Sequence, residues 1–170
     1  MSIKLIGAAL IITGCGGVGF SMAAAHRREE KALRQLIGAL DYMGCELQYH
    51  LTPLPELCRG AARQTSGCIR NVLLTLAQEL DSQIAPDANF CMNAAIAKTS
   101  KLPKLVEKKL LLLGQSLGHF DLQGQLKGLE NARQQCRRNL DEHSKDRDVR
   151  LRSYQTLGLC AGSALAILFL

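Results

Sequence analysis

The segment ALRQLIGALDYMGCELQYHL, which runs from Ala32 to Leu51, decides the fold class of this chain. Its apolar side chains recur at steps of three and four residues, which places them on one face of an α-helix. The positions of this stripe are Leu33, Leu36, Ile37, Leu40, Met43, Leu47 and Leu51. A helix with one apolar face has to bury that face, so the segment predicts the first helix of a packed bundle.

Helix breakers divide the residues that follow. Thr52 and Pro53 predict the start of a second helix, with Thr52 as the N-cap and Pro53 at the first helical position. Glu56 would then stabilise the positive end of that helix. Later breaks are predicted at Ser66-Gly67, Pro86-Asp87, Leu102-Pro103 and Gly118 to Asp121. The last stripe consists of Leu122, Leu126, Leu129, Cys136 and Leu140. Because no segment alternates as a strand does, we expect an all-α bundle of about six helices.

Both ends of the chain have the composition of membrane spans. Leu5 to Ala25 (LIGAALIITGCGGVGFSMAAA) and Ser153 to Leu170 (SYQTLGLCAGSALAILFL) contain no Asp, Glu, Lys, Arg or His. A helix needs about 20 mostly apolar residues to cross the hydrocarbon layer. The chain is therefore predicted to have three parts: a transmembrane helix at 1–25, a cytosolic helical bundle at 26–152 and a transmembrane helix at 153–170. The first and last helices of the bundle are expected to extend into the two spans.

The charges predict the orientation. All 15 acidic residues, and all of the 21 Lys and Arg residues except Lys4, lie between the two spans. Basic residues next to a span are retained in the cytoplasm, so both termini should lie outside. The same residues should contact anionic headgroups, each contributing about 1 kcal/mol. These membrane-flanking residues are Arg27, Arg28, Lys31, Arg147, Arg150 and Arg152.

A signal peptide is the alternative interpretation of the N-terminus. Lys4, an apolar stretch and Ala23-Ala24-Ala25 resemble a secretory signal with its cleavage site. Arg27 and Arg28 directly after such a site would disfavour export. Cleavage would also leave the exported bundle with an odd number of cysteines and no obvious disulfide framework.

A glycine motif at Gly14 to Gly19 matches the dinucleotide-binding pattern G-x-G-x-x-G. Its context does not, because no strand precedes it and no second strand with an acidic end follows. Small residues that recur every four positions, such as Thr13, Gly17 and Ser21, favour close packing of membrane helices instead.

Residue patterns for catalysis are missing from the sequence. The chain has no metal-binding H-E-x-x-H or C-x-x-C and no phosphate-binding Walker loop. The basic residues lack nearby aromatic platforms for nucleic acid. We expect a protein that is not an enzyme, holds no cofactor or metal and binds no nucleic acid, with cysteines that serve as small, reduced core residues.

Several segments together resemble the stage III sporulation protein AB family. They are ELQYHLTPLPE at 46–56, LGQSLG at 113–118 followed by Asp121 and Gln125, and YQTLG at 154–158. The resemblance covers essentially the whole chain. It implies a subunit of the transport complex between mother cell and forespore, in the membrane of the mother cell that engulfs the forespore.

The resemblance also implies a partner. The cytosolic part of the family is similar to the F domain of the platform protein in type II secretion machines, where the platform couples a cytosolic ATPase to a membrane assembly. The corresponding partner is the ATPase stage III sporulation protein AA, beside other stage III membrane subunits. A purely structural subunit with no ATPase contact is the alternative.

Geometry predicts the docking surface. If the first and last bundle helices rise from the spans at about 1.5 Å per residue, their far ends lie about 40 to 45 Å from the bilayer, side by side. The residues expected there are Thr52, Pro53, Leu54, Pro55, Glu56, Gly118, His119, Asp121 and Gln125.

Cysteine labelling tests the predicted orientation. An impermeant reagent applied outside should reach a cysteine placed at Ser2 and should not reach one placed at Lys104, because the basic residues hold the middle of the chain in the cytoplasm. The opposite pattern, or a mature chain that begins at His26, would contradict this orientation.

Overall fold

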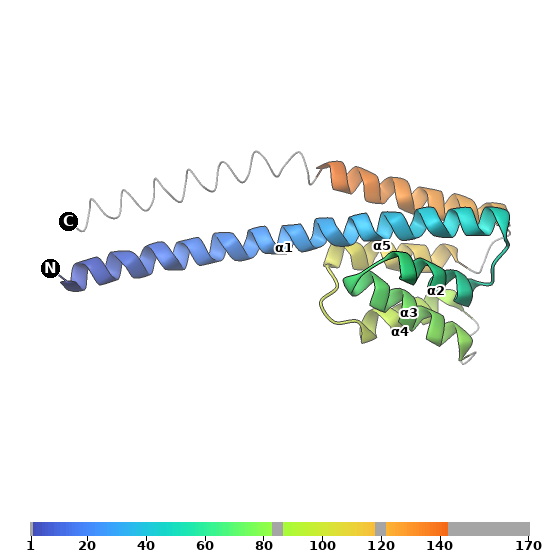
Figure 1. Ribbon diagram of the computed structural model, residues 1–170, viewed down its shortest axis with the longest axis horizontal. Helices are drawn as coiled ribbons and strands as arrows, with labels where there is room; N and C mark the ends of the chain where they lie inside the picture. The colour runs from blue at the N-terminus through green and yellow to red at the C-terminus, as the bar shows by residue number, and fades with distance from the viewer. Residues whose placement is uncertain (1, 83–86, 118–121, 143–170) are drawn as a thin grey trace. The chain divides into compact units, whose positions relative to one another are not determined.

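A computed structural model of the chain describes residues 2–82, 87–117 and 122–142, with side chains from residue 24 onward. Five labelled helices follow one another: α1 (Ser2–Tyr49), α2 (Leu54–Gln64), α3 (Gly67–Asp81), α4 (Ala88–Lys98) and α5 (Lys104–Ser116) (Figure 1). Residues 122–142 form a sixth, here called helix 122–142. These residues contain no strand, which confirms the all-α prediction.

The chain divides into two compact units, one of Met1–Arg28 with Asp141–Leu170 and one of Glu29–Leu140. The predicted first span is helical along its backbone and continuous with the stripe, since both lie in α1. The predicted second span at 153–170 lies outside the described residues. Within the part of the chain that was described, no helix combines the length and hydropathy that a membrane crossing requires.

The core of the Glu29–Leu140 unit forms around the predicted stripe of α1. Leu33, Leu36, Leu40, Met43 and Leu47 are all buried. Leu51 does not belong to the stripe, because α1 ends at Tyr49 and the Leu51 side chain is 67% exposed. Apolar residues of the other helices form one buried core together with this stripe, including Leu57, Ile69, Leu76, Met92, Leu110 and Leu129.

The connections between helices explain where each helix begins. Pro53 precedes α2 and Pro103 precedes α5, at positions where a helix has no use for the missing N–H. The predicted N-cap role of Thr52 is wrong, because α2 begins at Leu54 and the Thr52 hydroxyl donates to Glu46 Oε1 at 3.0 Å. Asp87 does cap α4, since its carboxylate accepts from the Asn89 N–H at 2.9 Å.

The two ends of this helical bundle can be named by residues that lie there. At the Glu29 end, the Ser66 N–H donates to Gln35 Oε1 at 2.8 Å, which places the α2–α3 connection beside the start of the α1 stripe. Lys109 donates to Gln135 Oε1 at 3.1 Å, and α5 runs antiparallel to helix 122–142, so the α4–α5 connection lies at the same end (Figure 1). The opposite, Leu51 end contains the connection from α1 to α2 and the start of helix 122–142 (Figure 1).

Close contacts between helices depend on two glycines. A Cβ at Gly60 in α2 would collide with the ring of Tyr42 in α1. A Cβ at Gly114 in α5 would lie 2.8 Å from Met92 Cβ in α4. Both glycines therefore let neighbouring helices approach closely enough to exclude water from the core.

Two leucine substitutions test this core. Leu36→Ala should lower the free energy of unfolding by about 2 to 5 kcal/mol, because Leu36 is 1% exposed and the change leaves a cavity. Leu36→Asp should unfold the bundle by burying an unpaired charge. The matched change Leu112→Ala, at a side chain 50% exposed, should cost about 1 kcal/mol or less. Equal losses for the two alanine variants in urea unfolding would contradict the packing described.

Candidate functional site

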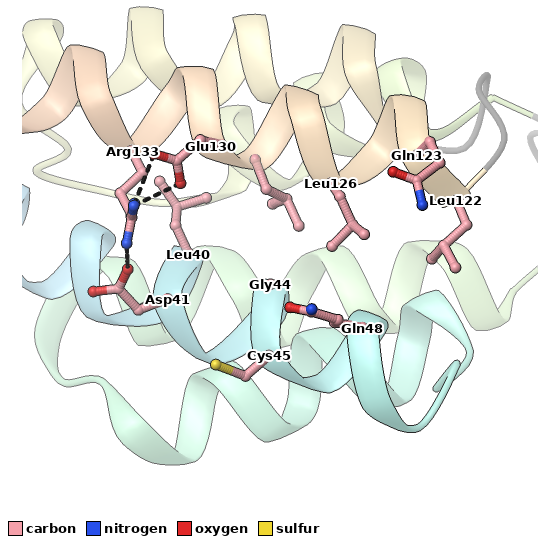
Figure 2. A pocket seen from close by; sticks show the side chains of 11 residues that line it. Leu40, Asp41, Gly44, Cys45, Gln48, Leu122, Gln123, Leu126, Glu130 and Arg133 are labelled. Atoms are coloured by element: carbon pink, nitrogen blue, oxygen red, sulfur yellow. Dashed lines mark hydrogen bonds and ion pairs between the residues drawn. The ribbon is translucent and has the colours of Figure 1, made fainter.

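A groove of about 640 Å³ lies between α1 and helix 122–142 (Figure 2). Gly44 contributes to the space, because a Cβ built there would meet nothing within 4 Å. The floor and walls include Leu40 and Gln48 from α1 with Leu122 and Leu126 from helix 122–142. Since these side chains are both apolar and polar and the groove is partly open, it suits a side chain of a partner protein better than an enclosed small molecule.

An ion-pair cluster closes the groove at the end away from Leu51. Arg133 Nη1 donates to Asp41 Oδ1 at 2.8 Å, and Nη2 donates to the Glu130 carboxylate at 2.7 Å (Figure 2). Arg137 lies 3.7 Å from the other oxygen of Asp41. The cluster joins α1 to helix 122–142, since Asp41 and Arg133 are 92 positions apart in the sequence. It fixes the register of the two helices that form the groove.

The cluster changes the protonation of its members. Hydrogen bonds from Arg133 and Gln134 lower the pKa of Glu130 below its ordinary value of 4.5. The hydrogen bonds to Glu130 and Asp41 raise the pKa of Arg133, so Arg133 and Glu130 both stay ionised at neutral pH. Within the described part of the chain, Arg133 Nε is the one buried side-chain polar atom that lacks a hydrogen-bond partner.

The α1–α2 connection at the Leu51 end exposes apolar side chains. Tyr49 is 74% exposed and Leu51 is 67% exposed. Leu51 also has a φ of 52°, a left-handed conformation that costs energy for a residue with a Cβ. The Thr52 hydrogen bond to Glu46 holds this connection against the end of α1. The chain thus presents two large apolar groups to solvent on a fixed, strained turn.

The structure describes some of the predicted docking residues and not others. Thr52, Pro53, Leu54, Pro55 and Glu56 lie together at the Leu51 end, where Leu54 is half-buried against the core and Glu56 is exposed. Gln125 lies in the first turn of helix 122–142. Other residues of this turn, Leu122 and Gln123, line the groove. Gly118, His119 and Asp121 lie outside the described residues.

The membrane-flanking residues divide in the same way. Arg27, Arg28 and Lys31 are exposed on α1, whereas Arg147, Arg150 and Arg152 lie outside the described residues. The glycine motif at 14–19 lies inside α1 and not in a strand-to-helix turn. This overturns the dinucleotide-binding alternative, since that motif has to bend the backbone around a pyrophosphate.

The cysteines are mostly structural. Burial raises the pKa of Cys58 to about 12 and that of Cys136 to about 11, and it also raises the pKa of Cys91. These thiols are therefore poor nucleophiles. Cys45 is exposed beside the groove. Among the residues for which side chains are described, no group of three His, Cys, Asp or Glu is arranged to hold a metal ion.

Sequence reasoning missed Asp41, Gly44, Arg133 and the exposure of Tyr49. Asp41 and Arg133 are ordinary charged residues on helices, and nothing in the sequence tells which pairs of helices are neighbours. The one available signal was the left-over apolar residue Leu51, which follows the stripe but directly precedes the breaker Thr52-Pro53.

Comparisons with known proteins agree with one another. A sequence model of the family described as stage III sporulation protein AB matches residues 4–170. Stage III sporulation protein AB of Bacillus subtilis (strain 168) is 25% identical over 171 residues, which cover 99% of each chain. A solved structure of a stage III sporulation protein AB has a similar fold, with a TM-score of 0.63 and 22% identity over 72% of this chain and 98% of that one.

The ion-pair cluster predicts a pH dependence of stability. Because the folded-state pKa of Glu130 is lowered, its contribution is complete above about pH 4.5 and is lost as pH falls through the folded-state value. Arg133→Met should therefore destabilise the protein at pH 7 by about 1 kcal/mol or less, and the difference from wild type should shrink in acid. Arg138→Met, an exposed change on the same helix, is the control in urea unfolding at each pH. A constant difference across pH for Arg133→Met would exclude this role.

Proposed function

Because the chain belongs to the stage III sporulation protein AB family, we propose that it is a non-enzymatic platform subunit of the transport complex between mother cell and forespore. The bundle lies in the cytoplasm and docks the ATPase stage III sporulation protein AA. The segments 1–25 and 153–170 hold it in the membrane of the mother cell, beside other stage III subunits, with both termini outside. A protein of this kind works by contact and needs no catalytic set.

The Leu51 end carries this proposal. Tyr49 is 74% exposed and Leu51 is 67% exposed. In the free protein, these two side chains therefore lack the favourable free energy that burial would provide. The left-handed backbone of Leu51 adds a second cost. Strain of this sort persists where a turn serves a purpose other than stability. A partner that covers both side chains would recover the burial free energy.

The surroundings indicate what the partner surface should contain. An aromatic and an aliphatic group make a suitable centre for an interface, and a polar rim excludes water around them. Here Glu46 and Glu56 flank the apolar pair, and residues 46–56 contain no Lys or Arg. The ATPase should therefore offer an apolar hollow bordered by basic residues. The groove between α1 and helix 122–142 lies beside this centre and provides room for one further side chain.

Two substitutions at this turn test the proposal. Tyr49→Ser combined with Leu51→Gly should weaken binding of the ATPase on the order of 100-fold, since apolar anchors at interface centres dominate affinity. The melting temperature should not fall, because both side chains are exposed and glycine adopts the φ of Leu51 without a Cβ clash. Binding can be measured by isothermal titration calorimetry with the purified ATPase.

The matched control is Phe90→Ser, which removes an aromatic side chain 62% exposed on α4. It should leave the affinity unchanged. If the double variant binds as wild type does, the docking surface lies elsewhere on the bundle. If the wild-type protein itself shows no binding, the alternative of a purely structural membrane subunit replaces this proposal.

A further inference from the structure

The connections at the two ends of the bundle differ in charge. The two connections at the Glu29 end lie within residues 63–70 and 98–104, and neither segment contains an acidic residue. Their basic residues are Arg63, Arg70, Lys98, Lys101 and Lys104. The two connections at the Leu51 end lie within residues 46–56 and 79–88, and neither contains Lys or Arg. Their acidic residues are Glu46, Glu56, Glu79, Asp81 and Asp87, although Glu79 and Lys98 pair with each other and so do not mark opposite ends.

Most of the acidic residues at the Leu51 end are paired with other residues of the bundle. Asp81 pairs with Arg59, and Glu79 pairs with Lys98 at 2.5 Å. Asp87 accepts the Asn89 N–H as a helix cap. Most of these carboxylates therefore have a structural role in the fold itself.

The basic residues at the Glu29 end, apart from Lys98, have no such role. Lys31, Arg63, Arg70, Lys101 and Lys104 are all exposed. Over the residues for which contacts are described, none of these five forms a hydrogen bond or an ion pair. Like charges gathered at one end of a small domain repel one another, so this arrangement opposes stability in the free protein.

Four different helices, or their flanking residues, supply these five charges. Lys31 belongs to α1, Arg63 to α2 and Arg70 to α3, while Lys101 and Lys104 lie at the start of α5. Charges distributed in this way around the end of a bundle do not converge on a point, as a site for a small anion requires. They suit an extended anionic surface.

The position of Glu29 in the chain identifies that surface. Glu29 follows the apolar segment Leu5 to Ala25 by four residues, which span at most about 14 Å of chain. We propose that the Glu29 end docks on anionic phospholipid headgroups through Lys31, Arg63, Arg70, Lys101 and Lys104. The inference rests on the proposed membrane location. The basic residues next to the spans are already expected to contact lipid. The new element is a second lipid contact, made by the folded bundle itself.

The fragment 29–142 isolates this contact from the flanking residues. It should fold by itself, because it contains the compact unit Glu29–Leu140, and the buried apolar residues that the structure describes lie between Ala32 and Cys136. Sedimentation with vesicles of phosphatidylcholine and phosphatidylglycerol should show binding that weakens as salt rises, since exposed charges are screened. Vesicles of phosphatidylcholine alone should bind no measurable amount.

Charge-matched variants locate the contact. Arg63→Gln, Arg70→Gln, Lys101→Gln and Lys104→Gln together should lower the partition into anionic vesicles on the order of 100-fold. The control changes net charge equally at exposed positions toward the Leu51 end: Gln48→Glu, Gln78→Glu, Gln115→Glu and Gln123→Glu. It should reduce binding far less. A charge-conserving variant, with Arg63→Lys, Arg70→Lys, Lys101→Arg and Lys104→Arg, should bind as wild type does.

Three results would overturn the proposal: no preference of the wild-type fragment for anionic vesicles, equal binding by the glutamine variant, or equal loss in the glutamate control. Circular dichroism melts establish that each variant is folded. Binding of the ATPase to the glutamine variant separates the two proposals. Loss of vesicle binding with retained ATPase binding supports both, whereas absence of ATPase binding with normal vesicle binding contradicts only the docking function.

Discussion

Burial of one face of α1 is the constraint on which the rest of the bundle depends. α2 and α4 have 11 residues each, too few to be stable alone in water. They are held because their buried residues join one core with Leu33, Leu36, Leu40 and Met43, and because α2 packs on α3 and α4 packs on α3 and α5. Proline and glycine at the connections then determine where each short helix begins, and Gly60 and Gly114 allow the close approach. The bundle therefore consists of one long helix and shorter helices that share its core and pack on one another in chain order.

The packing against α1 also decides which surfaces remain for function. Apolar residues in the core are buried and cannot contact a partner. Tyr49 and Leu51 lie beyond the end of the α1 stripe and stay exposed. The Arg133–Asp41 pair joins α1 to helix 122–142 and leaves the groove between them on the side toward Leu51. The antiparallel order of the short helices carries basic connections to one end and acidic connections to the other. The proposed contacts with a protein and with lipid thus lie at opposite ends of one small unit.

Helix positions were predictable because their signals are local. The stripe from Leu33 to Leu47 and the breaks before Leu54, Ala88 and Lys104 depend on residues within one or two turns of each other. Two local predictions were wrong for tertiary reasons. Thr52 bonds to Glu46 and does not cap α2, because the chain turns back against the end of α1. Leu51 matches the helical period but lies outside the helix, since the turn that precedes Pro53 has already begun.

The sequence alone determined the class of the fold, the family and the absence of recognisable catalytic motifs, because periodicity, breakers and short motifs are properties of neighbouring residues. It also determined that basic residues flank both apolar ends. Only the tertiary structure decided that Arg133 meets Asp41, that Tyr49 and Leu51 are exposed together, and that the α2–α3 and α4–α5 connections share one end of the bundle (Figure 1). The reason is physical: helix pairing depends on how whole apolar faces fit together, and no single segment contains that information.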